Sequence, residues 1–155
     1  MAHVRDRLGL IPHPEGGAFA EIFRSDRIVR PESHGKARRA LTQIYFHLEP
    51  GEVSRFHRVE SDEAWHLYEG EGLALYEWTP GATEVRRTRL SREEARFCHV
   101  VRAGRWQAAA PVSGPVLAGC SVGPGFEFED FALVDKDSPE ADAIRALDPD
   151  LERFL

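Results

Sequence analysis

Short strand-like runs separated by turn signals constrain the fold of this chain more than any other feature. Each run is rich in β-branched or aromatic residues, and pairs such as Pro50-Gly51 and Pro80-Gly81 break the chain between them. The runs span residues 18–23, 40–48, 64–68, 73–78, 84–90, 97–103, 116–122 and 128–134. This spacing predicts an antiparallel β-sandwich or barrel, and a small closed barrel of this kind can enclose one small ligand.

Helical patterns are confined to the two ends. Residues 3–10 predict a short helix that stops at a Pro- and Gly-rich loop beginning at Pro12. Near the other end, Ser138 is a suitable N-cap and Pro139 suits the first helical position, followed by early acidic residues and apolar spacing. The final residues 148–155 predict a further turn or small helix. We therefore expect an all-β core with short terminal helices.

Size and charge limit the function classes. The chain has 155 residues, is 42% hydrophobic and 30% charged, and so is expected to form a single domain over residues 1–155. A formal net charge of −6 argues against nucleic acid or an anionic membrane as the main partner. No segment is apolar enough to span a bilayer or to act as a secretion signal, which predicts a cytoplasmic protein. Cys98 and Cys120 lie in apolar runs and are interpreted as buried free thiols.

The stretch from Phe56 to Gly70, FHRVESDEAWHLYEG, is the densest in chemically versatile side chains. His57 and Glu63 are separated by six positions. An unpaired carboxylate is costly to bury, so Glu63 must meet a cation, a hydrogen-bond donor or a proton. His57, Arg55 and Arg105 are the candidate partners.

This stretch resembles the first motif of the cupin family, in which a glycine (here Gly51) precedes a His-x-His pair, a glutamate and a second glycine (here Gly70). The segment Val101–Gln107, VRAGRWQ, resembles the second cupin motif, with Gly104 in its glycine position. Together with PHPEGG, SRFHRV and GCSVGPGFEFEDF, the whole chain is similar to a small cupin family of largely unassigned function, often labelled predicted sugar epimerase. The resemblance implies a double-stranded β-helix, the cupin jelly-roll barrel, and a homodimer.

Two departures from the cupin motifs bear on metal binding. Val59 stands in place of the second histidine of His-x-His, and Gln107 in place of the histidine of the second motif. If a metal were present, its ligands would be His57, Glu63 and Gln107. Valine offers no donor atom and a carboxamide is a poor ligand for transition metals, so we predict no cofactor and disfavour a divalent metal.

Strand alternation indicates which side chains share a face. If Glu63 points inward, so does Trp65, whereas His66 and Tyr68 point the other way. The candidate catalytic residues are His57 and Glu63. The wider candidate ligand pocket also includes Trp65, Gln107, Tyr45, Tyr68 and His66. The mixed aromatic and acidic segment GPGFEFEDF is interpreted as an edge strand, a pocket entrance or a subunit contact.

Three functions remain open. The first is a small-molecule-binding cupin with epimerase or isomerase activity on a sugar or nucleotide-sugar-like ligand. In that case His57 or Glu63 would be the general base, and Tyr68 or Tyr45 would be the acid. The second is a non-catalytic ligand-binding or ligand-sensing cupin. The third is a metal-dependent cupin enzyme with a reduced ligand set.

Overall fold

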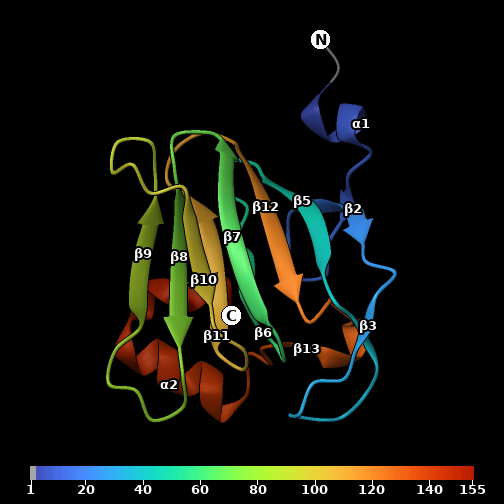
Figure 1. The fold of residues 1–155 in the computed structure, drawn as a ribbon. Coiled ribbons are helices and arrows are strands. Elements are labelled where there is room, and N and C mark those ends of the chain that lie inside the picture. Colours follow the sequence, from blue (N-terminus) through green and yellow to red (C-terminus); the bar gives the residue numbers. More distant parts are fainter. Residues whose placement is uncertain (1–2) are drawn as a thin grey trace.

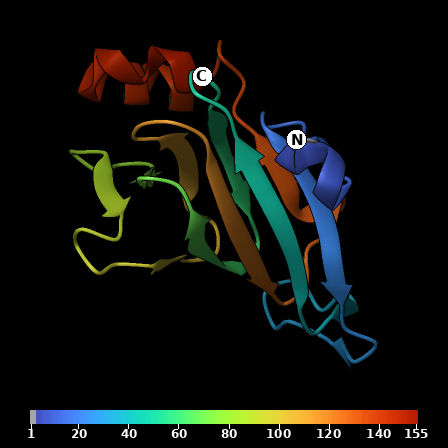
Figure 2. The same ribbon diagram turned by 90° about the horizontal axis from the view of Figure 1, so that it is seen from above.

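The structure, a computed structural model, describes residues 3–155 and consists of two antiparallel β-sheets that face each other (Figures 1 and 2). The six-stranded sheet has the order β1-β2-β5-β12-β7-β10. Its strands are β1 (Ile11–Pro12), β2 (Ala18–Arg24), β5 (Thr42–Leu48), β12 (Val116–Gly123), β7 (Asp62–Glu69) and β10 (Cys98–Val101). This arrangement confirms the predicted all-β jelly roll.

The second sheet has five strands in the order β13-β6-β11-β8-β9. They are β13 (Phe131–Leu133), β6 (Ser54–Val59), β11 (Trp106–Pro111), β8 (Leu73–Trp78) and β9 (Arg86–Leu90), and the short strands β3 (Ile28–Val29) and β4 (Arg38–Arg39) pair separately. Strands that follow each other in the chain often lie in opposite sheets, as β6 and β7 do. Residues of the Phe56–Gly70 stretch therefore reach the interior from both sides.

Two apolar clusters hold the layers together. The first fills the space between the sheets, where Phe46, Trp65 and Leu75 are almost completely buried. The second lies on the outer face of the five-stranded sheet, where Phe56 and Trp106 pack against the C-terminal helices. Burial of large side chains in both clusters supplies the main favourable term for folding.

The terminal helices match their predicted positions. They are α1 (Val4–Leu8), α2 (Pro139–Leu147) and the 3-10 segment η2 (Pro149–Phe154). A further 3-10 segment, η1 (Phe128–Asp130), occupies the start of the run 128–134 that was predicted as a strand, and only β13 within that run is a strand. The Ser138 side chain accepts a hydrogen bond from the Ala141 amide, which confirms the predicted N-cap. Helix α2 packs outside the five-stranded sheet (Figure 2), with Ile144 completely buried. Among residues 3–155, no helix is long and apolar enough to cross a membrane.

Two expectations from the sequence need correction. Strands β6 and β11 lie in the segments that resemble the cupin motifs, but neither is among the predicted strand-like runs. Each combines polar or small residues with few β-branched ones, so its strand pattern is weak. Cys98 was interpreted as buried but is exposed, because β10 is an edge strand and the thiol lies on its outer side; Cys120 is buried, and both thiols are free.

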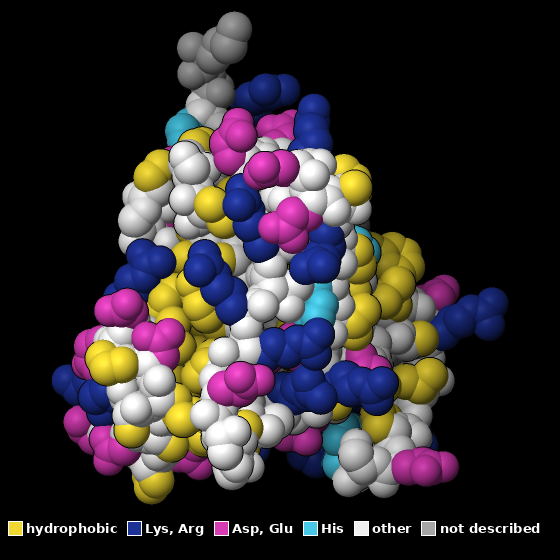
Figure 3. Space-filling view, turned by 90° about the vertical axis from the view of Figure 1, so that its left-hand side faces the viewer, with side chains coloured by type: hydrophobic (Ala, Val, Ile, Leu, Met, Phe, Trp, Pro, Cys, Tyr) yellow, Lys and Arg dark blue, Asp and Glu magenta, His cyan; other side chains and the backbone are white. Residues whose placement is uncertain are grey.

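Strand β9 forms one edge of the five-stranded sheet, and β13 forms the other. The sequence of β9, RRTRL, exposes Arg86 and Arg87 to solvent. Figure 3 views the side of the molecule that carries this strand and shows Lys and Arg side chains interspersed with acidic ones. Charged side chains discourage an exposed strand from pairing with another chain.

Candidate functional site

A cavity opens between the two sheets beyond the end of the central apolar cluster. It contains about 630 Å³ of empty space, part of which is open solvent at its mouth. Polar and aromatic side chains from both sheets and from the loop before β13 line it. They include His13, Glu15, Glu21, Arg24, His57, Glu63, Cys120, Phe19, Phe126, Glu127, Phe128 and Phe131.

His13 and Glu15 reach the cavity from the PHPEGG segment between β1 and β2. The two glycines that follow let this segment lie directly against its neighbours. A Cβ atom on Gly16 would lie 2.1 Å from the Val53 carbonyl oxygen, and the φ angle of Gly16 is +112°. Only glycine tolerates both conditions. The close approach also allows the Arg55 amide to bond to the Glu15 carbonyl, which ties this loop to β6.

His57 on β6 points into the cavity and contacts Glu15. Its Nδ1 atom lies 2.7 Å from the Arg55 carbonyl oxygen. A carbonyl only accepts hydrogen bonds, so Nδ1 carries a proton, and in the neutral ring the lone pair is on Nε2. Nε2 lies 3.3 Å from Glu15 Oε2. Glu15 Oε1 accepts a 2.7 Å hydrogen bond from Ser54, which fixes the orientation of the carboxyl group.

Glu63 on β7 is held by a different pair of residues. Trp65 Nε1 donates to Gln107 Oε1 (2.8 Å), and Gln107 Nε2 donates to Glu63 Oε2 (2.6 Å). An indole N–H is only a donor, so the amide oxygen of Gln107 must face Trp65 and its amino group must face Glu63. The buried Cys120 lines the same cavity. Glu63 therefore meets a hydrogen-bond donor, as its burial requires, and that donor is Gln107.

The buried acids and bases have pKa values displaced toward each other. Burial raises the pKa of Glu15 and of Glu63 above the ordinary carboxyl range. Burial also lowers the pKa of His57 and of His13. Each shift favours the uncharged form of the group. The cavity thus combines carboxyls whose pKa burial raises with imidazoles whose pKa burial lowers, a pairing suited to proton transfer.

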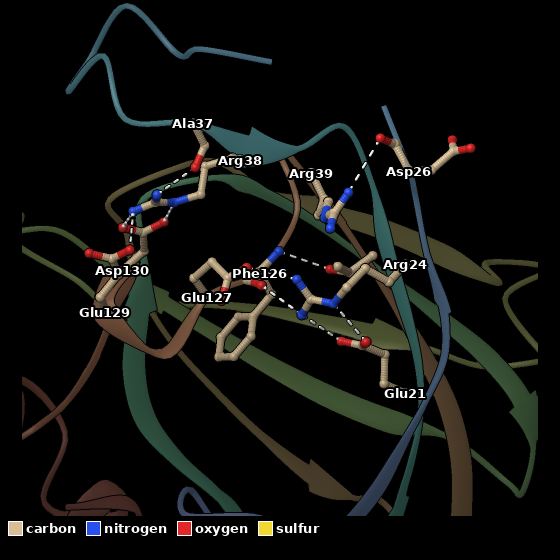
Figure 4. Close-up of polar contacts among 11 residues, drawn as sticks. Glu21, Arg24, Asp26, Ala37, Arg38, Arg39, Phe126, Glu127, Glu129 and Asp130 are labelled. Atoms are coloured by element: carbon tan, nitrogen blue, oxygen red, sulfur yellow. Dashed lines mark hydrogen bonds and ion pairs between the residues drawn. The ribbon is translucent and has the colours of Figure 1, made fainter. Parts of the chain in front are cut away.

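The outer wall of the cavity is the loop that precedes η1, and two arginines attach it (Figure 4). Arg24 at the cavity mouth bonds to both carboxylate oxygens of Glu21 at 2.8 Å and to Glu127 at 2.7 Å. Buried Arg38 on β4 forms a two-point contact with Asp130, at 2.6 and 2.7 Å. These contacts hold the aromatic side chains of the loop over the cavity.

The pocket-entrance interpretation of GPGFEFEDF is confirmed, because Phe126, Glu127, Phe128 and Phe131 line the cavity. Their rings form a cluster, with centroid separations of 5.0 Å between Phe126 and Phe128 and 6.0 Å from each of them to Phe131. The Phe131 ring also stacks on His57 at 5.5 Å. One wall of the cavity is therefore aromatic.

The remaining pocket candidates lie elsewhere. Tyr45, His66 and Tyr68 do not line the cavity but contact one another on the outer face of the six-stranded sheet, with ring centroids of neighbours about 6 Å apart. Strand alternation places them there, because Glu63 and Trp65 occupy the inner face of β7. Trp65 and Gln107 are buried behind Glu63 and orient it, rather than lining the cavity themselves.

The comparison with protein families agrees with this architecture. Residues 3–134 match the model described as Cupin superfamily (DUF985). The chain belongs to this cupin family. None of the curated proteins matches it.

Solved structures show the same fold at full length. A Shewanella oneidensis protein is 33% identical to this cupin, with 98% of this chain and 94% of the other covered at a TM-score of 0.79. A hypothetical protein from Leishmania major is 29% identical, with coverages of 97% and 93% and the same TM-score of 0.79. A Klebsiella pneumoniae protein with a double-stranded β-helix domain is 18% identical, with coverages of 87% and 97% and a TM-score of 0.56, which shows the shared fold.

The residues of this cupin fit a bound metal poorly. Val59 contributes no donor, and the oxygen of Gln107 already accepts the Trp65 N–H, so its amino group faces the site. An amino group of a carboxamide does not coordinate a metal ion. Across residues 3–155, no three His, Cys, Asp or Glu side chains converge in a way that could hold one. The donor set therefore does not match a cupin metal centre.

Sequence reasoning did not assign His13 and Glu15 to the site. Both belong to PHPEGG, whose prolines and glycines indicate the end of a helix and which contributes to the family resemblance. The available signal was a histidine and a glutamate two residues apart, immediately before two glycines. Glu21 and Arg24 were also missed, since charged residues on a strand-like run usually lie on a solvated face.

Proposed function

We propose that this cupin binds a small molecule in the cavity and transfers a proton to or from it, as an epimerase or isomerase does. The observation that supports this most directly is the Glu15–His57 pair, 3.3 Å apart and buried in the cavity between the sheets. The opposed pKa shifts of the two groups favour the neutral form of each, which suits His57 to act as a base and Glu15 as an acid.

The proposed reaction begins with removal of a proton from a carbon next to a carbonyl group. His57 Nε2 accepts this proton, and its Nδ1–H bond to the Arg55 carbonyl keeps the ring oriented and in the correct tautomer. A neutral carboxyl, Glu15 or Glu63, donates a hydrogen bond to the oxygen on which negative charge develops. Protonation of the other face of the carbon by the neutral carboxyl, with the abstracted proton kept on His57, gives an epimer. Return of the proton from His57 to a neighbouring carbon gives an isomer.

The cavity favours a small molecule without phosphate groups over a nucleotide sugar. Its aromatic wall offers an apolar surface to one small ring. A diphosphate needs cationic partners. Among the described lining residues, the guanidinium of Arg24 is the sole Lys or Arg side chain, and Glu21 and Glu127 already bind it.

The experiment is deuterium incorporation from D₂O into a panel of small hydroxy- and amino-carbonyl compounds, followed by proton NMR. At least one compound should lose a C–H signal with wild-type protein, and His57→Gln should abolish the exchange. His66→Gln is the matched control, because His66 lies on the outer face of the same barrel and should retain full exchange. Exchange that survives in His57→Gln would refute the proposed role of His57.

Binding without turnover is the second candidate function. A binding site is also suited by the four buried groups of the cavity and the aromatic rings near them. These groups are Glu15, Glu63, His13 and His57, and their pKa shifts favour the uncharged forms. A ligand that binds with micromolar affinity but shows no deuterium exchange would favour this candidate over catalysis.

A further inference from the structure

The charged groups around the cavity are predominantly acidic. Four glutamates, Glu15, Glu21, Glu63 and Glu127, line it, whereas Arg24 is the single Lys or Arg among the described lining residues. Arg24 makes four hydrogen bonds, three to Glu21 and Glu127 and one to the Phe126 carbonyl (Figure 4). Its charge is thus neutralised within the protein, and an anionic ligand finds no cationic partner there.

The two deepest carboxyls lack a cationic side chain of their own. Glu15 faces Ser54, His13 and His57, while Glu63 faces Gln107 and Cys120. None of these neighbours is a Lys or Arg. Two carboxyl groups are therefore buried in one small cavity, and each would gain by ionising against a positive charge placed between them.

The aromatic wall adds a second feature that suits a cation. The rings of Phe126, Phe128 and Phe131 cluster at centroid separations of 5.0–6.0 Å and line the same cavity as the two glutamates. The faces of aromatic rings attract cations within about 6 Å, and clusters of such rings recognise alkylated ammonium groups. An apolar body attached to an ammonium group would also pack against these rings.

We propose that the ligand of this cavity carries a positively charged amine, which one of Glu15 and Glu63 binds as a carboxylate and the other as a neutral carboxyl, while its apolar part contacts the phenylalanine cluster. This inference rests on the proposed function only in using the same cavity, and it narrows the substrate class to organic amines. Because the ammonium group favours the ionised form of the carboxyl that it contacts, we expect amine binding to release a proton from this pair.

The test uses three probes of nearly equal shape: benzylamine, benzyl alcohol and benzoate. Isothermal titration calorimetry near neutral pH measures the affinity of each. We expect benzylamine to bind about tenfold or more tightly than benzyl alcohol, as charge-assisted hydrogen bonds are stronger than neutral ones. Benzoate should bind most weakly. Titrations in two buffers with different ionisation enthalpies should reveal proton release with benzylamine and none with benzyl alcohol.

Substitutions of the two glutamates test which carboxyl groups bind the amine. Glu15→Gln and Glu63→Gln should each lower the affinity for benzylamine by about tenfold and change that for benzyl alcohol by only about twofold. Glu69→Gln, on the exposed end of the strand that carries Glu63, is the matched control and should bind all three probes as the wild type does. The comparison of probes on wild-type protein holds even if a glutamine variant fails to fold.

The inference is overturned if benzyl alcohol or benzoate binds wild-type protein as tightly as benzylamine does. It is also overturned if benzylamine shows no binding at millimolar concentration, or if its preference persists in both glutamine variants. These outcomes leave the proposed proton transfer intact, since that depends on deuterium exchange and on His57. Conversely, selective amine binding without exchange would support the inference and refute catalysis.

Discussion

The imidazole of His57 lies 3.3 Å from the carboxyl group of Glu15, a residue on a different strand connection and far away in sequence. Sequence motifs suggested Glu63 as the partner of His57. The structure shows that Glu63 instead accepts a hydrogen bond from Gln107. The site therefore contains one contacting acid–base pair and a second carboxyl nearby.

This contact predicts non-additive effects of substitution. If Glu15 and His57 act as a unit, Glu15→Gln and His57→Gln should each reduce deuterium exchange by about a hundredfold or more, and the double variant should lose little further. Exchange rates of the four proteins complete the double-mutant cycle. Independent effects, in which the two losses multiply, would show that the residues act separately.

The buried carboxyl of Glu63 predicts a pH dependence of stability. In the unfolded chain it ionises near its ordinary value of 4.5, whereas burial raises its pKa in the folded protein. Between these two values the folded state binds more protons, so this group's stabilising contribution is lost as the pH rises through the folded pKa. Glu63→Gln removes that loss. We expect its stability, relative to wild type, to increase as the pH rises from 4.5 through the folded pKa of Glu63.

Urea denaturation at each pH measures this difference. Glu69→Gln, which changes an exposed carboxyl on the same strand, is the control and should show a smaller trend with pH. The lowered pKa of His57 acts in the opposite sense, because its contribution is lost as the pH falls below about 6.5 toward the folded pKa. A Glu63→Gln variant that becomes relatively less stable at alkaline pH would contradict the assignment.

The close packing around Gly16 predicts that a single added methyl group there lowers the stability of the fold. Gly16→Ala places a Cβ atom 2.1 Å from the Val53 carbonyl oxygen, whereas a Cβ on Gly81 meets nothing within 4 Å. Both residues have positive φ angles, +112° and +87°, so the two variants share backbone strain of about 1–2 kcal/mol. Gly16→Ala should therefore be the more destabilising in thermal denaturation. Equal melting temperatures would argue against the close approach of the two segments.

We expect the wild-type protein to bind metal ions weakly, and we expect two substitutions to create a metal site. Protein purified without chelator is expected to contain well under one equivalent of zinc, nickel, manganese or iron by elemental analysis. Combining Val59→His with Gln107→His supplies two imidazoles beside His57 and Glu63, a donor set that transition metals prefer. We expect the double variant to acquire metal. A stoichiometric metal in the wild type that disappears in His57→Ala would instead support the metal-dependent alternative.

The uncovered face of the six-stranded sheet supports the prediction of a homodimer. Helix α2 covers the outer face of the other sheet, whereas Tyr68 and Val100 are 46% and 49% exposed on strands β7 and β10. Val100→Glu should shift a dimer toward monomer in light scattering at micromolar concentration. Val112→Glu, at an exposed site between β11 and β12, is the control and should not do so. A monomeric wild type would exclude the dimer.

Local patterns were sufficient for the elements of the fold. Strand-like runs with turn signals predicted the all-β architecture, and Ser138 with Pro139 predicted the start of α2. These features depend on side-chain periodicity and on capping, which act over a few residues. Alternation along β7 also placed Glu63 and Trp65 on one face and His66 and Tyr68 on the other.

What the sequence by itself determined was therefore the fold class, the terminal helices and the inward positions of His57 and Glu63. Only the tertiary structure decided that Glu15 contacts His57, that Gln107 turns its amino group toward Glu63, and that Arg24 is neutralised at the cavity mouth. The physical reason is that each of these relationships joins segments from different sheets or loops. Their distances depend on how the two sheets pack and on the close approach that Gly16 permits, neither of which leaves a periodic signal in the sequence.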